Sequence, residues 1–423
     1  MTSSMIPALV LFAAMYVCLL ILSDQRWIVS LVTAALFVAL GILPLAAAPG
    51  AVNWNVLMML AGTMVTVELF IQSKMPILMA EKLLRIVPNV QWAVVVLSLF
   101  SGLISAFVDN VATVLMVAPV GLAVSKHLKI NPVPVIISIA VSSNLQGAAT
   151  LVGDTTSILL GSYAGMSFND FFWFLNRPGI FFAVEAGALM TVPVLLWIFR
   201  REREKITPTG GTRVEDPVPG ILLLATVLGL IVASQFPEKP ALTNGIICCA
   251  MAVIGCVLSL LRRKGSAADA LKALDYKTLL LLSGLFLVIE GITRAGVIDA
   301  VAELFVKLGG GSRLALYVLI VGVSVALSAF IDNIPYVATM LPVVTSIAQR
   351  MGIDPYLFQF GLLIGATLGG NITPVGASAN IAGIGILQKE GYTVSTGDFM
   401  RIGIPFTLIA AVTGALVVWL CYA

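Results

Sequence analysis

The sequence predicts an all-α polytopic membrane protein with about ten transmembrane helices, two re-entrant helical hairpins and two inverted repeats. Three observations predict this fold class. Of the 423 residues, 59% are hydrophobic and only 11% are charged. Apolar runs long enough to cross a bilayer recur along the whole chain. The chain also repeats its own motifs at a nearly constant offset.

This composition excludes several classes of protein. An average soluble domain carries about 25% charged residues, so a soluble globular enzyme, a disordered chain and a nucleic-acid-binding protein are excluded. The net charge of +3 gives no reason to expect a polyanionic partner. We expect membrane lipid around the chain and no nucleic acid partner.

Ten apolar runs are expected to form membrane spans. The first lacks the basic n-region and the cleavage site of a signal peptide, so we interpret it as the first span. The runs lie at residues 5–22, 27–46, 54–72, 133–163, 178–199, 217–235, 242–261, 278–293, 357–388 and 403–422.

Two further apolar blocks, 91–126 and 314–350, do not fit single spans. Each has about 36 residues, which is too long for one crossing. Each is interrupted near its middle by an Asp-Asn pair. A helical hairpin that enters and leaves the membrane on the same side explains both features.

The Lys and Arg residues give an orientation. With both blocks re-entrant, eighteen of the 24 lie on one side of the membrane and six on the other. The positive-inside rule makes the richer side cytoplasmic. We therefore expect a multi-pass protein of the cytoplasmic membrane with both termini outside.

A polar, Pro- and Gly-containing segment at 200–219 is typical of a linker between two halves. The first half, 1–199, contains the hairpin 91–126 and a span at 133–163 that we expect to be broken. The second half, 220–423, contains the hairpin 314–350 and an equivalent broken span at 357–388. A short amphipathic stretch at 74–88 is expected on the cytoplasmic surface.

The two halves repeat each other at an offset of 223 residues. Residues 105–120 match 328–343 at eight of sixteen positions, and residues 144–158 match 367–381 with three coincident Gly and Thr positions. Each half holds five spans, an odd number, so the halves have opposite orientations in the membrane. Inverted repeats with interrupted helices are typical of secondary transporters.

The interrupted stretches 144–157 and 367–380 predict two ion sites. Irregular backbone inside a membrane is tolerated only where it lines a cavity or is buried in protein. Its free carbonyls ligate hard cations, and helix N-termini attract anions. The first site would combine Asp109, Asn110, Asn144, Thr150, Gly153, Asp154 and Ser157. The second would combine Asp332, Asn333, Asn371, Thr373, Gly376, Ser378 and Asn380.

The membrane carboxylates Asp109, Asp154 and Asp332 are the strongest chemical signal. A charge inside a bilayer is costly, and the motif stretches contain no Lys or Arg. Each Asp therefore needs a proton or a cation and can exchange one for the other. The structural alternative is an Asp that caps the following helix. Glu68 and Glu290, which align at an offset of 222, are weaker candidates for proton coupling because each can instead lie at a span end.

At these motifs the sequence resembles the ion transporter superfamily, and most closely the group of arsenite permeases, NhaD-type sodium/proton antiporters and melanosomal P proteins. The resemblance extends over nearly the whole chain. It is carried by SAFVDNVATVLMVAPV, SNLQGAATLVGDTTSILLGS, SAFIDNIPYVATMLPV and GGNITPVGASANIAG.

The resemblance implies a homodimer whose protomers each have a scaffold domain and a moving transport domain of elevator type. Two departures from the relatives stand out. The related sodium/dicarboxylate symporters carry Ser-Asn-Thr at the hairpin tips, whereas this chain has Asp-Asn-Val at 109–111 and Asp-Asn-Ile at 332–334. The nearer relatives commonly have Gly-Asp-Pro-Pro-Asn where this chain has Gly-Asp-Thr-Thr-Ser at 153–157, which changes the ligand set of the first site.

We therefore expect a secondary active transporter, not an enzyme, that exchanges protons for a small cation such as sodium. No cofactor is expected beyond Na+ or H+ as coupling ion. An arsenite permease or a permease for another inorganic or organic anion is an alternative within the same superfamily. A passive channel and an intramembrane aspartyl protease are alternatives from other classes. The protease is remote because the repeat places its two Asp on separate hairpins.

Overall fold

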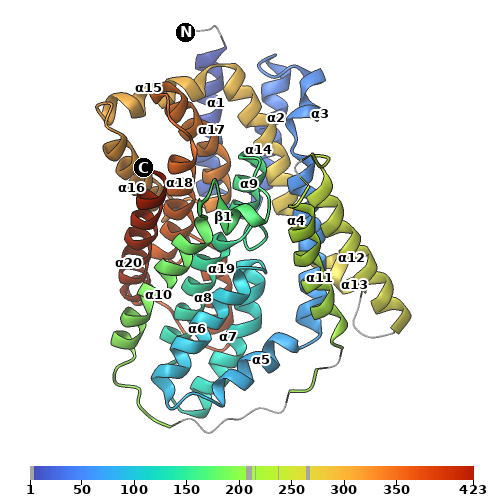
Figure 1. The fold of residues 1–423 in the computed structure, drawn as a ribbon, viewed down its shortest axis with the longest axis vertical. Coiled ribbons are helices and arrows are strands. Elements are labelled where there is room, and N and C mark those ends of the chain that lie inside the picture. Colours follow the sequence, from blue (N-terminus) through green and yellow to red (C-terminus); the bar gives the residue numbers. More distant parts are fainter. Residues whose placement is uncertain (1–3, 206–211, 215, 237, 263–266) are drawn as a thin grey trace.

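The computed structural model describes residues 4–205, 212–214, 216–236, 238–262 and 267–423, and these are almost entirely helical (Figure 1). Residues 206–211 and 215 of the predicted linker lie outside the described residues. The first half of the chain contains α1 (Met5–Ile21), α2 (Arg26–Ala39), α3 (Ala48–Ala51), α4 (Trp54–Gln72), α5 (Met75–Leu84), α6 (Val90–Ser105), α7 (Asn110–His127), α8 (Pro132–Gln146), α9 (Thr155–Tyr163), the short strands β1 (Trp173–Phe174) and β2 (Arg177–Pro178), and α10 (Ile180–Ile198). The second half contains α11 (Val218–Ala233), α12 (Thr243–Arg262), α13 (Ala267–Lys272), α14 (Tyr276–Arg294), α15 (Val297–Leu308), α16 (Arg313–Ser328), α17 (Asn333–Met351), α18 (Tyr356–Gly369), α19 (Ser378–Lys389) and α20 (Thr396–Tyr422).

Fewer helices than predicted have the length of a membrane span. Among the described residues, seven are long and apolar enough, or eight if the sharply bent pair α15–α16 counts as one span. Four of the ten predicted spans form shorter helices. Helix α1 has 17 residues, α2 has 14 and α11 has 16, and the span predicted at 357–388 is divided into α18 with 14 and α19 with 12. The apolar run of α2 continues beyond the helix, but Gly41 adopts a positive φ of 71° and ends it.

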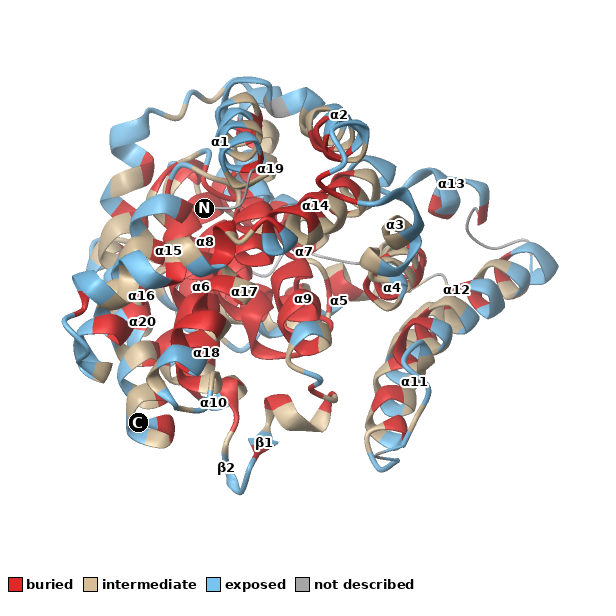
Figure 2. Cartoon of the chain, turned by 90° about the horizontal axis from the view of Figure 1, so that it is seen from above, coloured by how far each residue is buried: buried red, intermediate tan, exposed pale blue. Residues whose placement is uncertain are grey.

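The most deeply buried helices are α8 and α18. In the segment Pro132–Ala149, 94% of the residues are buried, and every residue from Leu357 to Gly369 is buried. Helices α6 and α7 pack against α8, and α16 and α17 pack against α18. Figure 2 shows the buried residues concentrated around this centre, whereas α11 and α12 lie at the periphery. The polar motifs of both halves are therefore held in the core of the molecule.

Both helices are interrupted at the Gly-rich motifs. After α8 the chain forms one 3-10 turn (Gly147–Ala149), becomes extended at Thr150 and restarts as α9. After α18 it forms an equivalent turn (Gly370–Ile372), becomes extended at Thr373 and restarts as α19. At both breaks, backbone N–H and C=O groups that would be paired within a continuous helix are therefore available for hydrogen bonds to other partners.

The Asp-Asn motifs lie between antiparallel helix pairs. Residues 106–109 join α6 to α7, and residues 329–332 join α16 to α17. Helices α5 and α15, which precede these pairs, lie at opposite ends of the molecule (Figure 1). The two helix pairs therefore approach the core from opposite ends.

The N-terminal helices reach the tip of the second helix pair. Helix α2 packs along α14, with the rings of Trp27 and Tyr276 6.5 Å apart. On α1, the hydroxyl of Tyr16 donates to the carbonyl of Pro335 at 2.9 Å and contacts the hydroxyl of Thr339 at 2.8 Å. The beginning of α17 is thus fixed against the first two helices of the chain.

Candidate ion-binding site

Four aspartates stand at the N-termini of helices. The carboxylate of Asp109 accepts hydrogen bonds from the amides of Val111 and Ala112 and so begins α7. Asp154 caps α9, Asp275 caps α14 and Asp332 caps α17, each through a backbone amide within the next three residues. The capping role proposed as the structural alternative is therefore present in all of them. Capping occupies only part of each carboxylate, however.

Three of these caps share a cavity. A cavity of about 290 Å³ lies between the start of α7, the start of α9, the start of α17 and the end of α13. Its lining includes the predicted site residues Asp109, Asn110, Asp154, Asn333 and Ser378, together with Glu68 from α4. The structure thus brings residues of both predicted sites to one common space.

All the ionisable side chains that line the cavity are acidic. Four carboxylates line it, those of Glu68, Asp109, Asp154 and Asp275, and no Lys, Arg or His is among its lining residues. Asp154 is only 4% exposed, and its Oδ2 lies 3.5 Å from the side-chain nitrogen of Asn333. Within the described residues no three carboxylates converge closely enough to hold a metal ion by themselves. A cation here would complete its shell with hydroxyl and carbonyl oxygens.

The threonines of the two motifs fix the helix breaks to the hairpin tips. The hydroxyl of Thr150 donates to the carbonyl of Ala106, and that of Thr373 donates to the carbonyl of Ala329. Both threonines are buried. These predicted ligands therefore contribute a positioning hydrogen bond in this structure, and each holds an interrupted helix against the tip of its own helix pair.

Two glycines allow the backbone segments at each helix break to pack closely together. A Cβ on Gly153 would lie 2.5 Å from the carbonyl oxygen of Gly147, and one on Gly376 would lie 2.6 Å from that of Gly370. Real Cβ atoms essentially never come that close to backbone oxygen. Gly153 and Gly376 are therefore required by packing at the breaks.

Asparagines connect the two breaks directly. The side-chain amide of Asn144 donates to the carbonyl of Thr367 at 2.8 Å and to the side chain of Asn371 at 3.0 Å. Asn371 donates in turn to the carbonyl of Val141 at 2.8 Å, and Asn110 donates to Asn144 at 2.9 Å. All of these amides are buried, so the predicted first and second sites form one hydrogen-bonded core.

Two further predicted ligands bond to backbone within their own halves. Ser157 donates to the carbonyl of Gly147 at 3.2 Å, and Asn380 donates to the carbonyls of Gly370 and Thr373 at 2.9 and 3.1 Å. Neither lines the cavity. Both instead satisfy carbonyls that the helix breaks leave without a helical partner.

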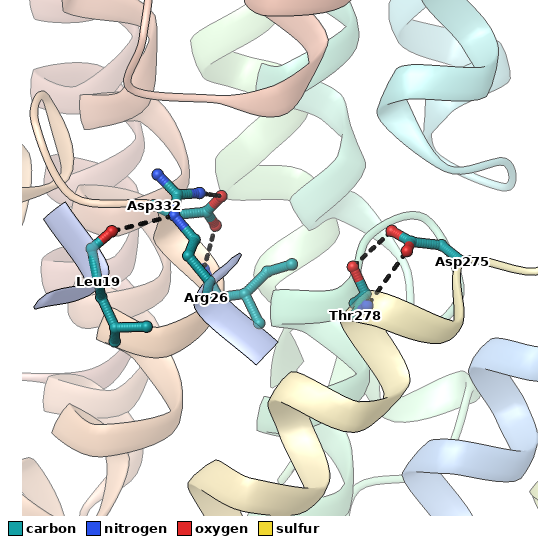
Figure 3. Close-up of polar contacts among 6 residues, drawn as sticks. Leu19, Arg26, Asp275, Thr278 and Asp332 are labelled. Atoms are coloured by element: carbon teal, nitrogen blue, oxygen red, sulfur yellow. Dashed lines mark hydrogen bonds and ion pairs between the residues drawn. The ribbon is translucent and has the colours of Figure 1, made fainter. Parts of the chain in front are cut away.

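Asp332 has a basic partner, contrary to our expectation of an unpaired membrane carboxylate. A guanidinium nitrogen of Arg26 lies 2.8 Å from its Oδ2, while the Nε of Arg26 donates to the carbonyl of Leu19 at 3.3 Å (Figure 3). The motif stretches could not reveal this partner, because Arg26 lies 306 residues earlier in the chain. Asp332 is also absent from the lining of the cavity, unlike Asp109.

The two candidate glutamates occupy different environments. Glu68 lines the cavity and accepts a hydrogen bond from Gln72 at 3.2 Å. Glu290 forms an ion pair with Arg294 at 2.6 Å, with both side chains partly exposed, and lies outside the cavity lining. Only Glu68 is therefore placed where it can meet an ion.

Sequence reasoning missed Asp275 and Thr278 at the mouth of the cavity. Asp275 is exposed, and its carboxylate accepts from the amide and the hydroxyl of Thr278 at 3.1 and 2.6 Å (Figure 3). Both residues line the same cavity as Asp109. An Asp three residues before a Thr at the start of an apolar run is a capping signal, but it carries no information about a site.

Comparisons with known proteins show consistent similarities. A family model described as "Citrate transporter" (CitMHS) matches residues 16–359 and 301–423. An uncharacterised transporter of Mycobacterium tuberculosis is 32% identical over 431 residues, which cover 99% of both chains. The P protein of Homo sapiens is 25% identical over 457 residues, covering 88% of this chain and 53% of that protein. The crystal structure of the Alcanivorax borkumensis YdaH transporter has a similar fold, with a TM-score of 0.65, 14% identity and coverage of 95% and 97% of the two chains.

Proposed function

The chain belongs to the citrate transporter family of the ion transporter superfamily, and from this premise we propose that it is a secondary active transporter that exchanges protons for a small cation. The resemblance to that superfamily seen in the motifs is thereby confirmed. The transporter names of the family and of its mycobacterial member give the protease alternative no support.

One observation carries the choice of a cation, namely the cavity lined by four carboxylates and no basic side chain. Gathering four like charges around one cavity is costly unless a positive charge accompanies them, and the cost is greatest for Asp154, which is buried. A bound cation or protons satisfy that requirement, whereas an unaccompanied anion increases the repulsion. The cavity therefore favours a site that alternates between a cation and protons.

The residues of the cavity have distinct proposed roles. Asp109 accepts both of its backbone hydrogen bonds at Oδ2, which leaves Oδ1 directed to a cation or a proton. Asp154 supplies the second carboxylate, oriented by the hydroxyl of Thr156 at 2.7 Å. Asn110 and Asn333 supply neutral polar groups, Glu68 takes part in proton coupling, and the exposed Asp275 makes the electrostatic potential at the entrance more negative.

The proposed mechanism uses two inverted repeats. The hydrogen bonds from Thr150 to Ala106 and from Thr373 to Ala329 recur at the 223-residue offset, as do the close contacts of Gly153 and Gly376, which supports this organisation. We further propose that α1, α2, α4 and α11–α14 form a scaffold in a homodimer. The helix pairs and broken helices would then move past this scaffold as an elevator, in a cytoplasmic membrane with both termini outside.

A second candidate is the transport of a carboxylate such as citrate together with a cation. The description of the matched family favours it, and the cavity offers the amides of Asn110 and Asn333 and the hydroxyls of Thr155 and Ser378 as donors to a carboxylate. Because the cavity is acidic, citrate would enter only with charge-neutralising cations. This candidate predicts that citrate and a cation depend on each other for transport.

The test uses proteoliposomes that contain a pH-sensitive dye and are held under a proton gradient. Sodium, lithium, potassium, magnesium, citrate and arsenite are added separately, and citrate is also added with each cation. Asp109→Asn and Asp154→Asn are compared with wild type, and Glu303→Gln, which removes an exposed carboxylate of α15, is the matched control. Proton movement on addition of a cation alone, lost in both Asp variants and kept in the control, supports the antiporter. A response that requires citrate with a cation favours the second candidate, and a response to arsenite alone contradicts both.

A further inference from the structure

A second cavity shares no lining residue with the acidic one and has the opposite charge. It has a volume of about 650 Å³ and lies where the start of α8, the end of α10 and the start of α20 meet. Three arginines line it, Arg200 and Arg201 just after α10 and Arg401 in the first turns of α20. We call this space the arginine pocket.

The arginine pocket has a net positive charge. Asp398 is the one carboxylate in its lining, and the Oδ2 of Asp398 accepts a hydrogen bond from the hydroxyl of Ser395 at 2.6 Å. Within the described ranges, none of the three arginines forms an ion pair. The N-terminal ends of α8 and α20 also border the pocket, and their helix dipoles add partial positive charge. The pocket therefore attracts an anion that the described part of the chain does not supply.

One arginine is already oriented. The guanidinium of Arg200 lies 4.5 Å from the ring centre of Trp197, and its Nη1 donates to the carbonyl of Trp197 at 3.2 Å. These contacts restrict the long side chain before any ligand binds, which lowers the entropic cost of binding. The remaining donors of the guanidinium stay free for the oxygen atoms of an anion.

Much of the remaining lining of the arginine pocket is apolar. Ile137, Ile198 and Ile402 line it, and Trp197 is 64% exposed beside it. Helices α10 and α20 are both candidate membrane spans, and the pocket lies at the end of the first and the start of the second. Tryptophan and arginine at the end of a span mark the depth of lipid headgroups. A ligand here would meet positive charge at one end and hydrocarbon surface at the other.

We propose that the arginine pocket binds the phosphate headgroup of an anionic phospholipid, whose acyl chains lie along Trp197 and Ile198 at the end of α10. A free phosphate shares the anionic chemistry, but it would leave the apolar walls and the exposed Trp197 uncovered. A basic pocket between membrane helices on one face is a known way to hold anionic headgroups. This inference is independent of the ion that the acidic cavity transports.

The test measures lipid binding to the purified full-length protein in a neutral detergent by native mass spectrometry. Phosphatidylglycerol and phosphatidylcholine are titrated separately against wild type and against the double variant Arg200→Gln/Arg401→Gln. We expect wild type to prefer phosphatidylglycerol, and the double variant to bind it about 30-fold more weakly, since each arginine near an anionic headgroup contributes about fivefold. Lys307→Gln removes an exposed positive charge of α15 and should leave binding unchanged.

Three further results define the outcome. Unchanged phosphatidylglycerol binding by the double variant would overturn the proposal. Displacement of the lipid by millimolar inorganic phosphate, with no preference between the two lipids, would assign the pocket to a free anion and also overturn it. If the double variant does not elute as a monodisperse protein, the single variant Arg401→Gln replaces it. This variant should bind phosphatidylglycerol about fivefold more weakly than wild type, and unchanged binding would overturn the proposal.

Discussion

The ion pair between Arg26 and Asp332 gives the sharpest prediction about stability. The two charged groups are 2.8 Å apart, with side-chain exposures of 21% and 12%. Two charges about 4 Å apart attract by about 4 kcal/mol at an effective dielectric constant of 20, and desolvation offsets much of this. Removing one partner leaves the other partly buried without its counter-ion. We expect Arg26→Gln and Asp332→Asn each to lower the free energy of unfolding by about 2 kcal/mol.

The double variant tests whether the effects of the two substitutions are coupled. Arg26→Gln/Asp332→Asn leaves no uncompensated charge, so it should cost about 2 kcal/mol rather than the sum of about 4. In detergent, this corresponds to thermal midpoints about 2 °C below wild type for all three variants, because the unfolding entropy grows with chain length. Addition of sodium should restore part of the midpoint of Arg26→Gln, because Asp332 then accepts an external cation, and should restore nothing in Asp332→Asn. A double variant that melts about 5 °C lower, together with no sodium effect on Arg26→Gln, would refute the coupling.

Three more predictions follow from the site. Gly153→Ala places a Cβ 2.5 Å from a backbone oxygen and should lower stability by about 2 kcal/mol, whereas Gly385→Ala, with nothing within 4 Å, should be neutral in the same melting assay. Asp275→Asn removes a carboxylate at the mouth of the cavity and should raise the KM for the cation about threefold to tenfold at low ionic strength, with the difference shrinking at high salt and kcat unchanged. Glu68→Gln should reduce proton-coupled flux in proteoliposomes at least about tenfold, and Glu290→Gln, on a side chain outside the cavity, should not. Equal effects of the two Glu substitutions would contradict the different roles assigned to them.

The elements of the site were predictable where the signal is local. Asp109 and Asp332 each interrupt an apolar block at a capping position, so their places at the starts of α7 and α17 follow from the sequence. The helix breaks follow from Gly-rich polar motifs inside long apolar spans. The repetition of both features at one offset identified them as related, since chance repetition of such patterns is rare.

The partners of these residues were not predictable, because they are set by tertiary packing. Arg26 contacts Asp332 only because α2 packs along α14 and so reaches the beginning of α17. Asp275 enters the cavity only because the start of α14 faces the start of α7. The hydroxyls of Thr150 and Thr373 were predicted as ligands from composition alone, and their bonds to hairpin carbonyls depend on geometry that no local pattern encodes.

The link between Asn144 and Asn371 has a thermodynamic consequence. Each asparagine serves the other half of the chain, so displacing one break strains the hydrogen bonds of the other. If an ion binds as proposed and tightens the first break, part of that free energy reaches the second, and the reverse holds equally, as reciprocity between coupled sites requires. Under that proposal, we expect the two breaks to respond to the ion as one cooperative unit.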